Sequence, residues 1–379
     1  MLKIAFNQEY LDIFIENIST KLNEYLIGIM NKLSDEEATL LCYIKEDIGI
    51  TNILKAVPNN VSFTGSQKII DIIEKVENEI NRLESTISRT ITKKDFESYI
   101  KTLQQRELKK IINTHNISVS GRMTNNILIK TLLEKDIRYF DRKSRIKYSK
   151  LYFKKQANKI LNNVFVDFYN KKWNESLNYT KYDFVNKINL KSCPYCNMNY
   201  IFIVEEDKLR PEIDHFYPKS KYPYLAMSYF NLIPSCQVCN RTKSSAFSNE
   251  MVNPYSDINN DNNIKFTINI QNVDFLQLKE KKYNFNSFKI KIKETTNDNV
   301  TKFSLEKLYE QHKDIVLDLL IKQQYYPKKY VSFLRTFSFT EDEIYRYLIG
   351  NYNKDEDLHK RPLSKLTKDI VDELNLMRK

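Results

Sequence analysis

Glycine is scarce in this chain of 379 residues, which contains five: Gly28, Gly49, Gly65, Gly121 and Gly350. An average chain of this length would contain about 26. Phosphate-binding loops need clustered glycines, because their backbone amides must approach the ligand closely. No two of these glycines are close in sequence, which argues against a Walker-type NTPase, a dinucleotide-binding fold and a Gly-rich kinase loop. The shortage also favours helices joined by Asn- or Asp-type turns over a large β-sandwich.

Long apolar runs are missing as well. No window approaches the roughly 18 consecutive apolar residues of a membrane span. Gln8, Glu9 and Asp12 interrupt the stretch that a secretion signal would keep apolar. We therefore expect a soluble cytoplasmic protein with no membrane partner. Hydrophobic residues make up 41% of the chain, which excludes wholesale disorder, and the length suggests two or three domains.

The chain is basic, with 60 Lys and Arg against 48 Asp and Glu and a net charge of +12. Such an excess indicates an anionic partner, with nucleic acid or an anionic membrane surface as the leading candidates. Residues 131–173 supply +8 of this charge and also carry many aromatic side chains. Basic side chains there could contact phosphates while aromatics stack on bases. The equally weighted alternative is a solvated helix face.

Three consecutive segments differ in character. Residues 1–185 have helical patterning, residues 186–260 concentrate proline and cysteine, and residues 261–379 look mixed. Ser34 with Glu37, and Thr340 with Glu343, match the capping box at a helix start. Residues 264–270 and 288–294 alternate like strands and could pair as a hairpin. The predicted fold class is α+β and mostly helical, with a small module between a helical N-terminal region and a mixed α/β C-terminal region.

Residues 66–89 show the clearest helical pattern. Apolar residues recur at alternating spacings of four and three, at Ile69, Ile73, Val76, Ile80, Leu83 and Ile87. This seam is typical of a coiled coil, through which the chain could form a homo-oligomer or dock on a partner. A long helix packed inside its own domain gives the same pattern, and we favour that interpretation because three heptads is a short seam.

Four of the five cysteines form two C-x-x-C pairs, Cys193 with Cys196 and Cys236 with Cys239. Two such pairs supply four thiolates for a tetrahedral structural zinc. Disulfides and a redox-active pair are the alternatives, and a cytoplasmic location disfavours disulfides. The fifth, Cys42, is expected to be a buried small hydrophobic residue.

Between the two pairs lie residues able to carry chemistry. Asp214 could bind a hard divalent ion while the adjacent His215 accepts a proton from water. Asn240 follows the second pair and could offer an amide oxygen to the same ion. Three basic side chains of this region could contact phosphate oxygens: Lys219, Arg241 and Lys243. Together these residues suggest a phosphodiesterase site.

These residues resemble the pattern of the HNH endonucleases, whose fold is a ββα-metal module. The matching positions are Asp214-His215, Asn231-Leu232 and Cys236-x-x-Cys239-Asn240-x-x-Lys243, and the upstream cysteines match the zinc-stabilised branch of the family. The resemblance covers about 65 residues. The chain departs from the pattern at Asn240, where a histidine is common, and at Ser244, where a glycine is common.

The resemblance implies a role for each residue. His215 would be the general base, oriented through its other ring nitrogen by a backbone carbonyl. Asp214 and Asn240 would bind the catalytic ion, with Mg²⁺ expected and Mn²⁺ or Ni²⁺ able to substitute. Asn231 would pin the loop that presents His215. The expected reaction is hydrolysis of a phosphodiester bond, leaving 3′-hydroxyl and 5′-phosphate ends.

The segments around these motifs also look like the HNH effectors of bacterial anti-phage systems, such as the Septu and retron-associated nucleases. Those effectors commonly work beside an ATPase. We therefore predict a metal-dependent endonuclease, a hydrolase that acts on DNA, with RNA as the alternative substrate. Two other hypotheses stay open. One is a non-catalytic zinc-knuckle protein that binds nucleic acid, and the other is a nuclease subunit that is latent until an ATPase or sensor docks on it.

Overall fold

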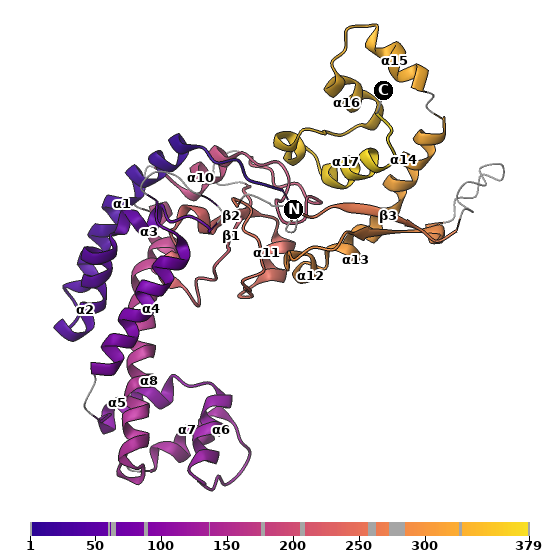
Figure 1. The fold of residues 1–379 in the computed structure, drawn as a ribbon. Helices are drawn as coiled ribbons and strands as arrows, with labels where there is room; N and C mark the ends of the chain where they lie inside the picture. The colour runs from indigo at the N-terminus through magenta and orange to yellow at the C-terminus, as the bar shows by residue number, and fades with distance from the viewer. Residues whose placement is uncertain are drawn as a thin grey trace. The chain divides into compact units, whose positions relative to one another are not determined.

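The computed structural model describes most of the chain, namely residues 2–59, 61, 66–86, 90–135, 137–175, 179–204, 209–256, 263–272, 285–325 and 328–377. It is mostly helical with two small antiparallel sheets, so the predicted α+β class is confirmed (Figure 1). The chain divides into two compact units. The larger contains Met1–Asn23, Ile50–Ile70 and Phe165–Lys379, and the smaller contains Glu24–Gly49 and Asp71–Val164. The predicted segments 1–185, 186–260 and 261–379 describe sequence character, and as domains they stay a prediction.

The smaller unit is built from helices. They are α2 (Asp35–Tyr43), most of α4 (Ile69–Thr86), α5 (Lys93–Lys101), α6 (Gln105–Thr114), α7 (Asn125–Leu133) and α8 (Arg142–Leu161). Helix α6 turns Leu108, Ile111 and Ile112 inward, since residues three and four apart share one face of a helix. Those side chains join a core that includes Phe96 and Tyr148. Helix α2 begins at the capping box predicted for Ser34 and Glu37.

Helix α4 carries the apolar seam predicted for residues 66–89. Ile69, Ile73 and Val76 are buried within the chain, and Ile80 and Leu83 are half-buried. Ile87 lies outside the described residues. Since the buried part of the seam is already covered by the protein itself, the structure favours a packed helix over a free coiled-coil surface.

The basic stretch 131–173 runs through α8 and the short helices that follow it. Most of its aromatic side chains are inside the protein: Phe140 and Tyr148 in the core of the smaller unit, and Phe168 and Trp173 in the larger unit. Tyr139 is an exception, being half exposed. The structure therefore gives most of these rings a packing role, and stacking on bases is left to few of them.

The larger unit contains the remaining helices. They are α1 (Gln8–Met30), whose last turns belong to the smaller unit, α3 (Ile50–Leu54), α9 (Trp173–Glu175), α10 (Lys181–Ile188), α11 (Gln237–Lys243), α12 (Asn299–Lys302), α13 (Leu305–Tyr309), α14 (Lys313–Tyr325), α15 (Lys328–Arg335), α16 (Glu341–Ile349) and α17 (Ser364–Glu373). Phe14 of α1 makes edge contacts with Trp173 and Tyr229 at centroid distances of 5.9 and 5.4 Å. This aromatic core connects the N-terminal helix to the segment between the two cysteine pairs.

The first sheet is short. Strands β1 (Glu212–His215) and β2 (Leu232–Ser235) pair antiparallel, with Asp214 opposite Ile233 and His215 opposite Leu232. Helix α11 follows β2 directly and packs on β1. The stretch from Glu212 to Lys243 therefore forms strand, strand and helix in that order, with the second cysteine pair at the start of α11. It carries the residues that sequence analysis singled out.

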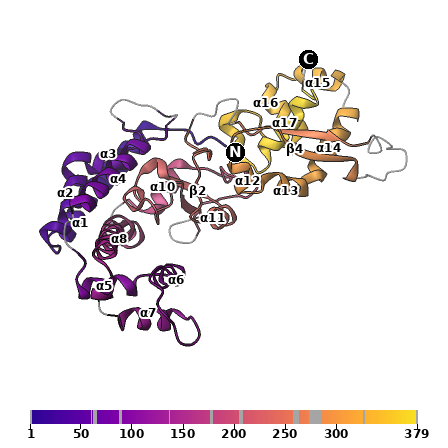
Figure 2. The ribbon, with the colours of Figure 1, turned by 60° about the horizontal axis from the view of Figure 1, so that its bottom comes forward.

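The second sheet confirms the predicted hairpin. Strands β3 (Phe266–Ile270) and β4 (Phe288–Ile292) pair antiparallel, with Ile268 opposite Ile290. The hairpin packs against α17, where the backbone amide of Phe266 donates to the Asp369 carboxylate at 2.9 Å (Figures 1 and 2). Helix α16 begins at the predicted capping box of Thr340 and Glu343.

Asparagine takes over backbone conformations that usually favour glycine. Among the described residues, the asparagines with positive φ are Asn116, Asn189, Asn197 and Asn375. Asn189, for example, ends α10 in the left-handed region. The expectation of Asn-type turns is thus confirmed.

The expectation for Cys42 is wrong, because its side chain is exposed on α2. In the described part of the chain, no helix is both long and apolar enough to cross a membrane, and a cytoplasmic location stays a prediction.

Candidate active site and metal centre

The four cysteines of the C-x-x-C pairs come together in one buried cluster. Their sulfur atoms all lie within 4.8 Å of one another, and those of Cys196 and Cys236 are 4.0 Å apart. A disulfide would need about 2.05 Å, whereas zinc bound tetrahedrally at about 2.3 Å from each sulfur holds the sulfurs about 3.8 Å apart. Burial raises the pKa of the Cys193 thiol well above its ordinary value, and a cation bound among the four sulfurs would favour its thiolate form. The cluster could hold a zinc ion.

The first cysteine pair is fixed from three directions. The backbone amide of Leu2 donates to the Pro194 carbonyl at 2.8 Å, and the Tyr309 hydroxyl donates to the Cys196 carbonyl. The buried Asn197 amide accepts from the backbone of Lys365 at 2.9 Å. The segment of the first cysteine pair is therefore tied to Leu2 and to the C-terminal helices α13 and α17.

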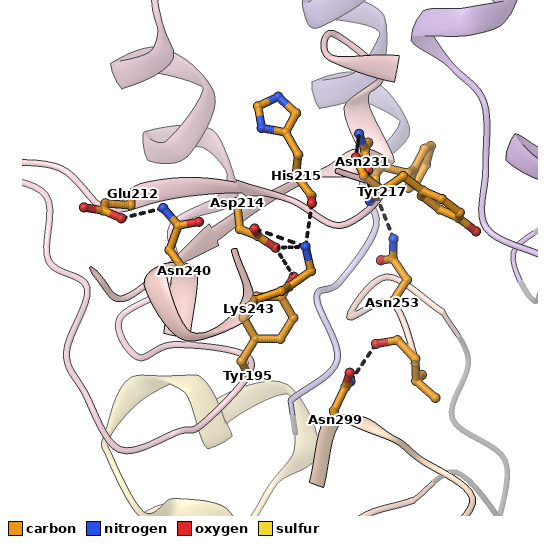
Figure 3. A network of polar contacts seen from close by, with 12 residues as sticks. Tyr195, Glu212, Asp214, His215, Tyr217, Asn231, Asn240, Lys243, Asn253 and Asn299 are labelled. Atoms are coloured by element: carbon orange, nitrogen blue, oxygen red, sulfur yellow. Dashed lines mark hydrogen bonds and ion pairs between the residues drawn. The ribbon is translucent and has the colours of Figure 1, made fainter. Parts of the chain in front are cut away.

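Asp214 is buried beneath this cluster, with 3% of its surface exposed. The hydroxyl of Tyr195, which stands between the first two cysteines, donates to one Asp214 oxygen at 2.7 Å. The Lys243 ammonium lies 3.2 and 3.1 Å from the two oxygens (Figure 3). Burial raises the pKa of Asp214, and the Lys243 ammonium opposes that rise. Both carboxylate oxygens thus already have partners within the protein.

Lys243 is placed differently from its predicted contact with phosphate. Its side chain is fully buried, and its ammonium donates to the His215 backbone carbonyl at 2.6 Å as well as to Asp214. It is therefore an internal counter-ion at the end of α11. Ser244 then leaves the helix at φ 49°, a conformation that favours the glycine common at this position. Arg241, also predicted to meet phosphate, is exposed on the same helix.

Asn240 lies on the Asp214 side of β1. Its amide nitrogen donates to the Glu212 carboxylate, and Figure 3 shows its oxygen turned toward Asp214. Glu212 and Asp214 are two residues apart on the strand, so they face the same side of the sheet. Sequence analysis missed Glu212, although the period of two along a strand could have indicated it.

His215 projects from the opposite side of β1 to Asp214, as adjacent strand residues do (Figure 3). Its Nε2 lies 3.0 Å from the Ala226 carbonyl oxygen, which leaves Nδ1 as the second ring nitrogen. Its ring meets the ring of Tyr169 edge-on at a centroid distance of 4.5 Å. Burial is the main cause that lowers the pKa of His215 to about 3, so the imidazole is neutral near pH 7.

Asn231 holds the loop that follows His215. Its side-chain oxygen accepts from the Tyr217 amide at 2.6 Å, and its nitrogen donates to the carbonyls of Tyr217 and Leu225 at 3.1 and 2.9 Å. All three side-chain bonds go to backbone groups of one loop, which also contains Ala226, the partner of His215. The amide therefore fixes the position of the carbonyl that orients the imidazole.

Other side chains complete the surroundings of His215. Lys219 lies with its ammonium 3.0 Å from the Asn170 side-chain oxygen and 4.6 Å from the Tyr169 ring centroid. Lys181, from α10, approaches the same ring at 4.3 Å. Sequence analysis missed Lys181 and Tyr169, because nothing in a sequence spacing of 34 or 46 residues from His215 indicates contact.

The structure thus defines a mostly helical protein whose strand–strand–helix module is fastened to a four-thiol cluster. In sequence comparisons, 67 residues are 36% identical to the Septu protein PtuB of Bacillus thuringiensis. The alignment covers 17% of this chain and 24% of PtuB, so the chain matches about a quarter of that protein's length. No protein-family model matches the chain, and no solved structure resembles it.

Proposed function

We propose that this protein is a metal-dependent endonuclease of the HNH type that hydrolyses phosphodiester bonds of DNA. One observation carries the proposal: a neutral His215, held through Nε2 by the Ala226 carbonyl, on a strand–strand–helix module fastened to four thiols. A neutral imidazole with one fixed nitrogen can accept a proton at the other. The partial likeness to a Septu protein supports the same function.

In this proposal His215 accepts a proton from the attacking water at Nδ1. The oxygen of that water bonds to phosphorus, the bond between phosphorus and the 3′-oxygen of the preceding sugar breaks, and the leaving 3′-oxygen takes a proton from solvent water. The products are a 3′-hydroxyl and a 5′-phosphate. Asn231 acts through the loop that it holds, since its three bonds fix the segment containing the Ala226 carbonyl.

Two metals of different roles fit this chain. Zinc would be held by Cys193, Cys196, Cys236 and Cys239, whose spacing suits a closed structural site. Mg²⁺ would be held by the Asp214 carboxylate and the Asn240 amide oxygen, the hard donors that this ion prefers, with Glu212 alongside. Mn²⁺ or Ni²⁺ could substitute. Bound there, the ion would supply positive charge that stabilises the phosphate. Asp214 would then bind both this ion and the Lys243 ammonium.

The proposed substrate and biological role rest on the net charge of the chain and on its similarity to a Septu protein. A net charge of +12 supports nucleic acid as the partner, and Arg241, which is exposed on α11, would contact its backbone. The relative is a Septu protein, so we propose a role in anti-phage defence, beside an ATPase or another defence component. DNA is preferred as substrate over RNA.

The test is a cleavage assay on supercoiled, linear and single-stranded DNA, with and without Mg²⁺, and with RNA in parallel. His215→Ala is expected to lower the cleavage rate by about 10²–10⁴-fold, the usual contribution of a general base, while DNA binding persists. His312→Ala, outside the module, is the control. Zinc content and melting temperature show whether each variant is folded. A His215→Ala protein that cuts as fast as the wild type would refute the mechanism.

A latent nuclease is the second candidate, favoured by the likeness to a Septu protein. It predicts no cleavage by the isolated chain and strong cleavage after co-expression with an ATPase encoded beside it. DNA binding with no cleavage in either preparation would instead indicate the non-catalytic zinc-knuckle protein.

A further inference from the structure

Two lysine side chains approach the buried ring of Tyr169, and the charge of an arginine acts on it. Tyr169 belongs to a short π-helix, Phe168–Lys172. The ammonium groups of Lys181 and Lys219 lie 4.3 and 4.6 Å from its ring centroid, and the charge of Arg210 acts on both Tyr169 and Lys181. Lys181 comes from α10, Lys219 from the loop after β1, and Arg210 from the segment before β1. Three separate segments therefore bring positive charge to one ring.

This positive charge has no carboxylate partner in the part of the chain that the structure describes. Lys219 donates to the neutral amide of Asn170 at 3.0 Å, and Arg210 donates to the Pro211 carbonyl at 3.0 Å. Lys181 contacts the faces of Tyr169 and Trp173. By contrast Lys243, on the other side of β1, is paired with Asp214. The charges of Asp214 and Glu212 also act on Tyr169, but in the described part of the chain neither forms an ion pair with these cations.

Burying an unneutralised cation is unfavourable, and Lys181 is buried, with 7% of its surface exposed. Burial first, and then the charges of Arg210 and Lys219, lower its pKa to about 8. A bound anion would oppose this lowering, because an opposite charge favours the protonated amine. The arrangement is that of a site whose counter-ion is a ligand.

The cations also have a functional neighbour. The His215 ring packs edge-on against the Tyr169 ring, at a centroid distance of 4.5 Å. The charges of Lys219 and Lys181 both act on the imidazole. An anion bound between the two lysines would therefore lie beside the imidazole. Ammonium groups contact phosphate oxygens as point charges without regard to base sequence.

We propose that Lys181 and Lys219, which both approach the Tyr169 ring, form a phosphate-binding cradle that holds a backbone phosphate of the nucleic acid beside His215. The identity of the anion rests on the proposed function, whereas the presence of an anion site rests on the unpaired charges alone. Lys181 stands outside the HNH-like motif, so the helical region before the first cysteine pair contributes directly to substrate binding.

Trp173 is a fluorescence probe for the cradle, because it is the chain's one tryptophan. Its ring centroid lies 6.0 Å from the Lys181 ammonium and 5.6 Å from the Tyr169 ring. The full chain is titrated with inorganic phosphate, and separately with a short single-stranded thymidine oligonucleotide, without added divalent metal and at constant ionic strength. We expect a saturable change in tryptophan fluorescence with both probes.

Lys181→Met and Lys219→Met are each expected to lower the binding affinity for both probes by about tenfold or more. This is the effect of losing one charge-assisted hydrogen bond. Lys187→Met, an exposed lysine of the same helix, is the matched control and should bind as the wild type does. Lys181→Arg keeps the charge and should retain binding if the methionine variant does not fold. Unchanged affinity in folded Lys181→Met and Lys219→Met proteins would overturn the cradle.

The two proposals fail separately. Loss of phosphate binding in the lysine variants, with cleavage that does not depend on His215, leaves the cradle standing and removes the proposed mechanism. Loss of phosphate binding with unchanged oligonucleotide binding overturns the assignment to the nucleic-acid backbone. A wild-type protein that binds neither probe overturns the cradle, whatever its nuclease activity.

Discussion

Tyr195 donates its hydroxyl to the Asp214 carboxylate at 2.7 Å, and this bond links the first cysteine pair to the candidate active site. Tyr195 stands between Cys193 and Cys196, so a metal that fixes these two cysteines also fixes the tyrosine. Both partners of the bond are buried. The orientation of Asp214 therefore depends on the cysteine cluster, although none of the cysteines contacts the substrate in the proposed mechanism.

Replacing Tyr195 with phenylalanine tests this link. The variant removes one hydrogen bond to a buried carboxylate, and such bonds to charged groups contribute about 1.5–3 kcal/mol. We expect the free energy of unfolding in urea to fall by that amount while the zinc content is unchanged. Tyr200→Phe, at a half-exposed tyrosine nearby, is the control and should have little effect. A loss below about 0.5 kcal/mol would show that the bond does not stabilise the fold.

The buried pair of Lys243 and Asp214 predicts strong coupling between two substitutions. Lys243→Met leaves a buried carboxylate without its counter-ion, which typically costs about 3–5 kcal/mol. Adding Asp214→Asn removes the unpaired charge and should recover much of that loss. Urea unfolding of the two single variants and the double variant measures the coupling. Arg241→Met, on the exposed face of the same helix, should stay within about 0.5 kcal/mol of the wild type. Additive single effects would contradict a direct ion pair.

The cysteine cluster predicts one zinc ion per chain. Cys236→Ser is expected to lose the metal and to lower the melting temperature, because a structural zinc contributes to folding directly. Cys42→Ser is the matched control, since Cys42 is exposed and lies outside the cluster. Elemental analysis and thermal unfolding, before and after treatment with a strong chelator, check both. A metal-free protein with an unchanged melting temperature would argue against a structural zinc.

Phosphate binding should depend on pH through Lys181. Its pKa in the folded protein is lowered to about 8, and a lysine loses its charge above its pKa. Affinity for inorganic phosphate is therefore expected to fall as pH rises from 7.5 to 9.5. Phosphate completes its second ionisation in the lower part of this range and affects every protein alike, so Lys181→Arg, which keeps its charge throughout, is the reference and should lose less affinity. A wild-type profile that parallels that of the arginine variant would exclude Lys181 from the site.

The same shift has a consequence for stability with a definite sign. The pKa of Lys181 is lower in the folded state than the ordinary value of 10.5, so the unfolded chain binds a proton more readily between these values. Stability therefore decreases as pH falls from about 10.5 towards 8. The Lys181→Met variant lacks this contribution. As pH falls over that range, the free energy of unfolding of the variant should therefore rise relative to that of the wild type.

Local patterns in the sequence predicted a good part of the structure. The two C-x-x-C pairs, the capping boxes at Ser34 and Thr340, and the alternating segments that became β3 and β4 were all recognisable. Each depends on neighbouring residues or on a period of two or 3.6 along the chain. The scarcity of glycine likewise anticipated asparagine in left-handed turns. These features follow from local backbone chemistry, which the sequence contains in full.

The arrangement of the site was decided by tertiary structure. Nothing local indicates that Lys243 is buried against Asp214 instead of facing solvent, or that Tyr195 reaches the same carboxylate. The aromatics of 131–173 alternate with lysines like a binding surface, yet most of them pack in cores. Tyr169 meets the His215 ring, and Lys181 meets the Tyr169 ring, only because segments far apart in the chain fold together. Such contacts join residues far apart in the chain, and burial, which sets both their pairing and their pKa values, is a property of the folded protein alone.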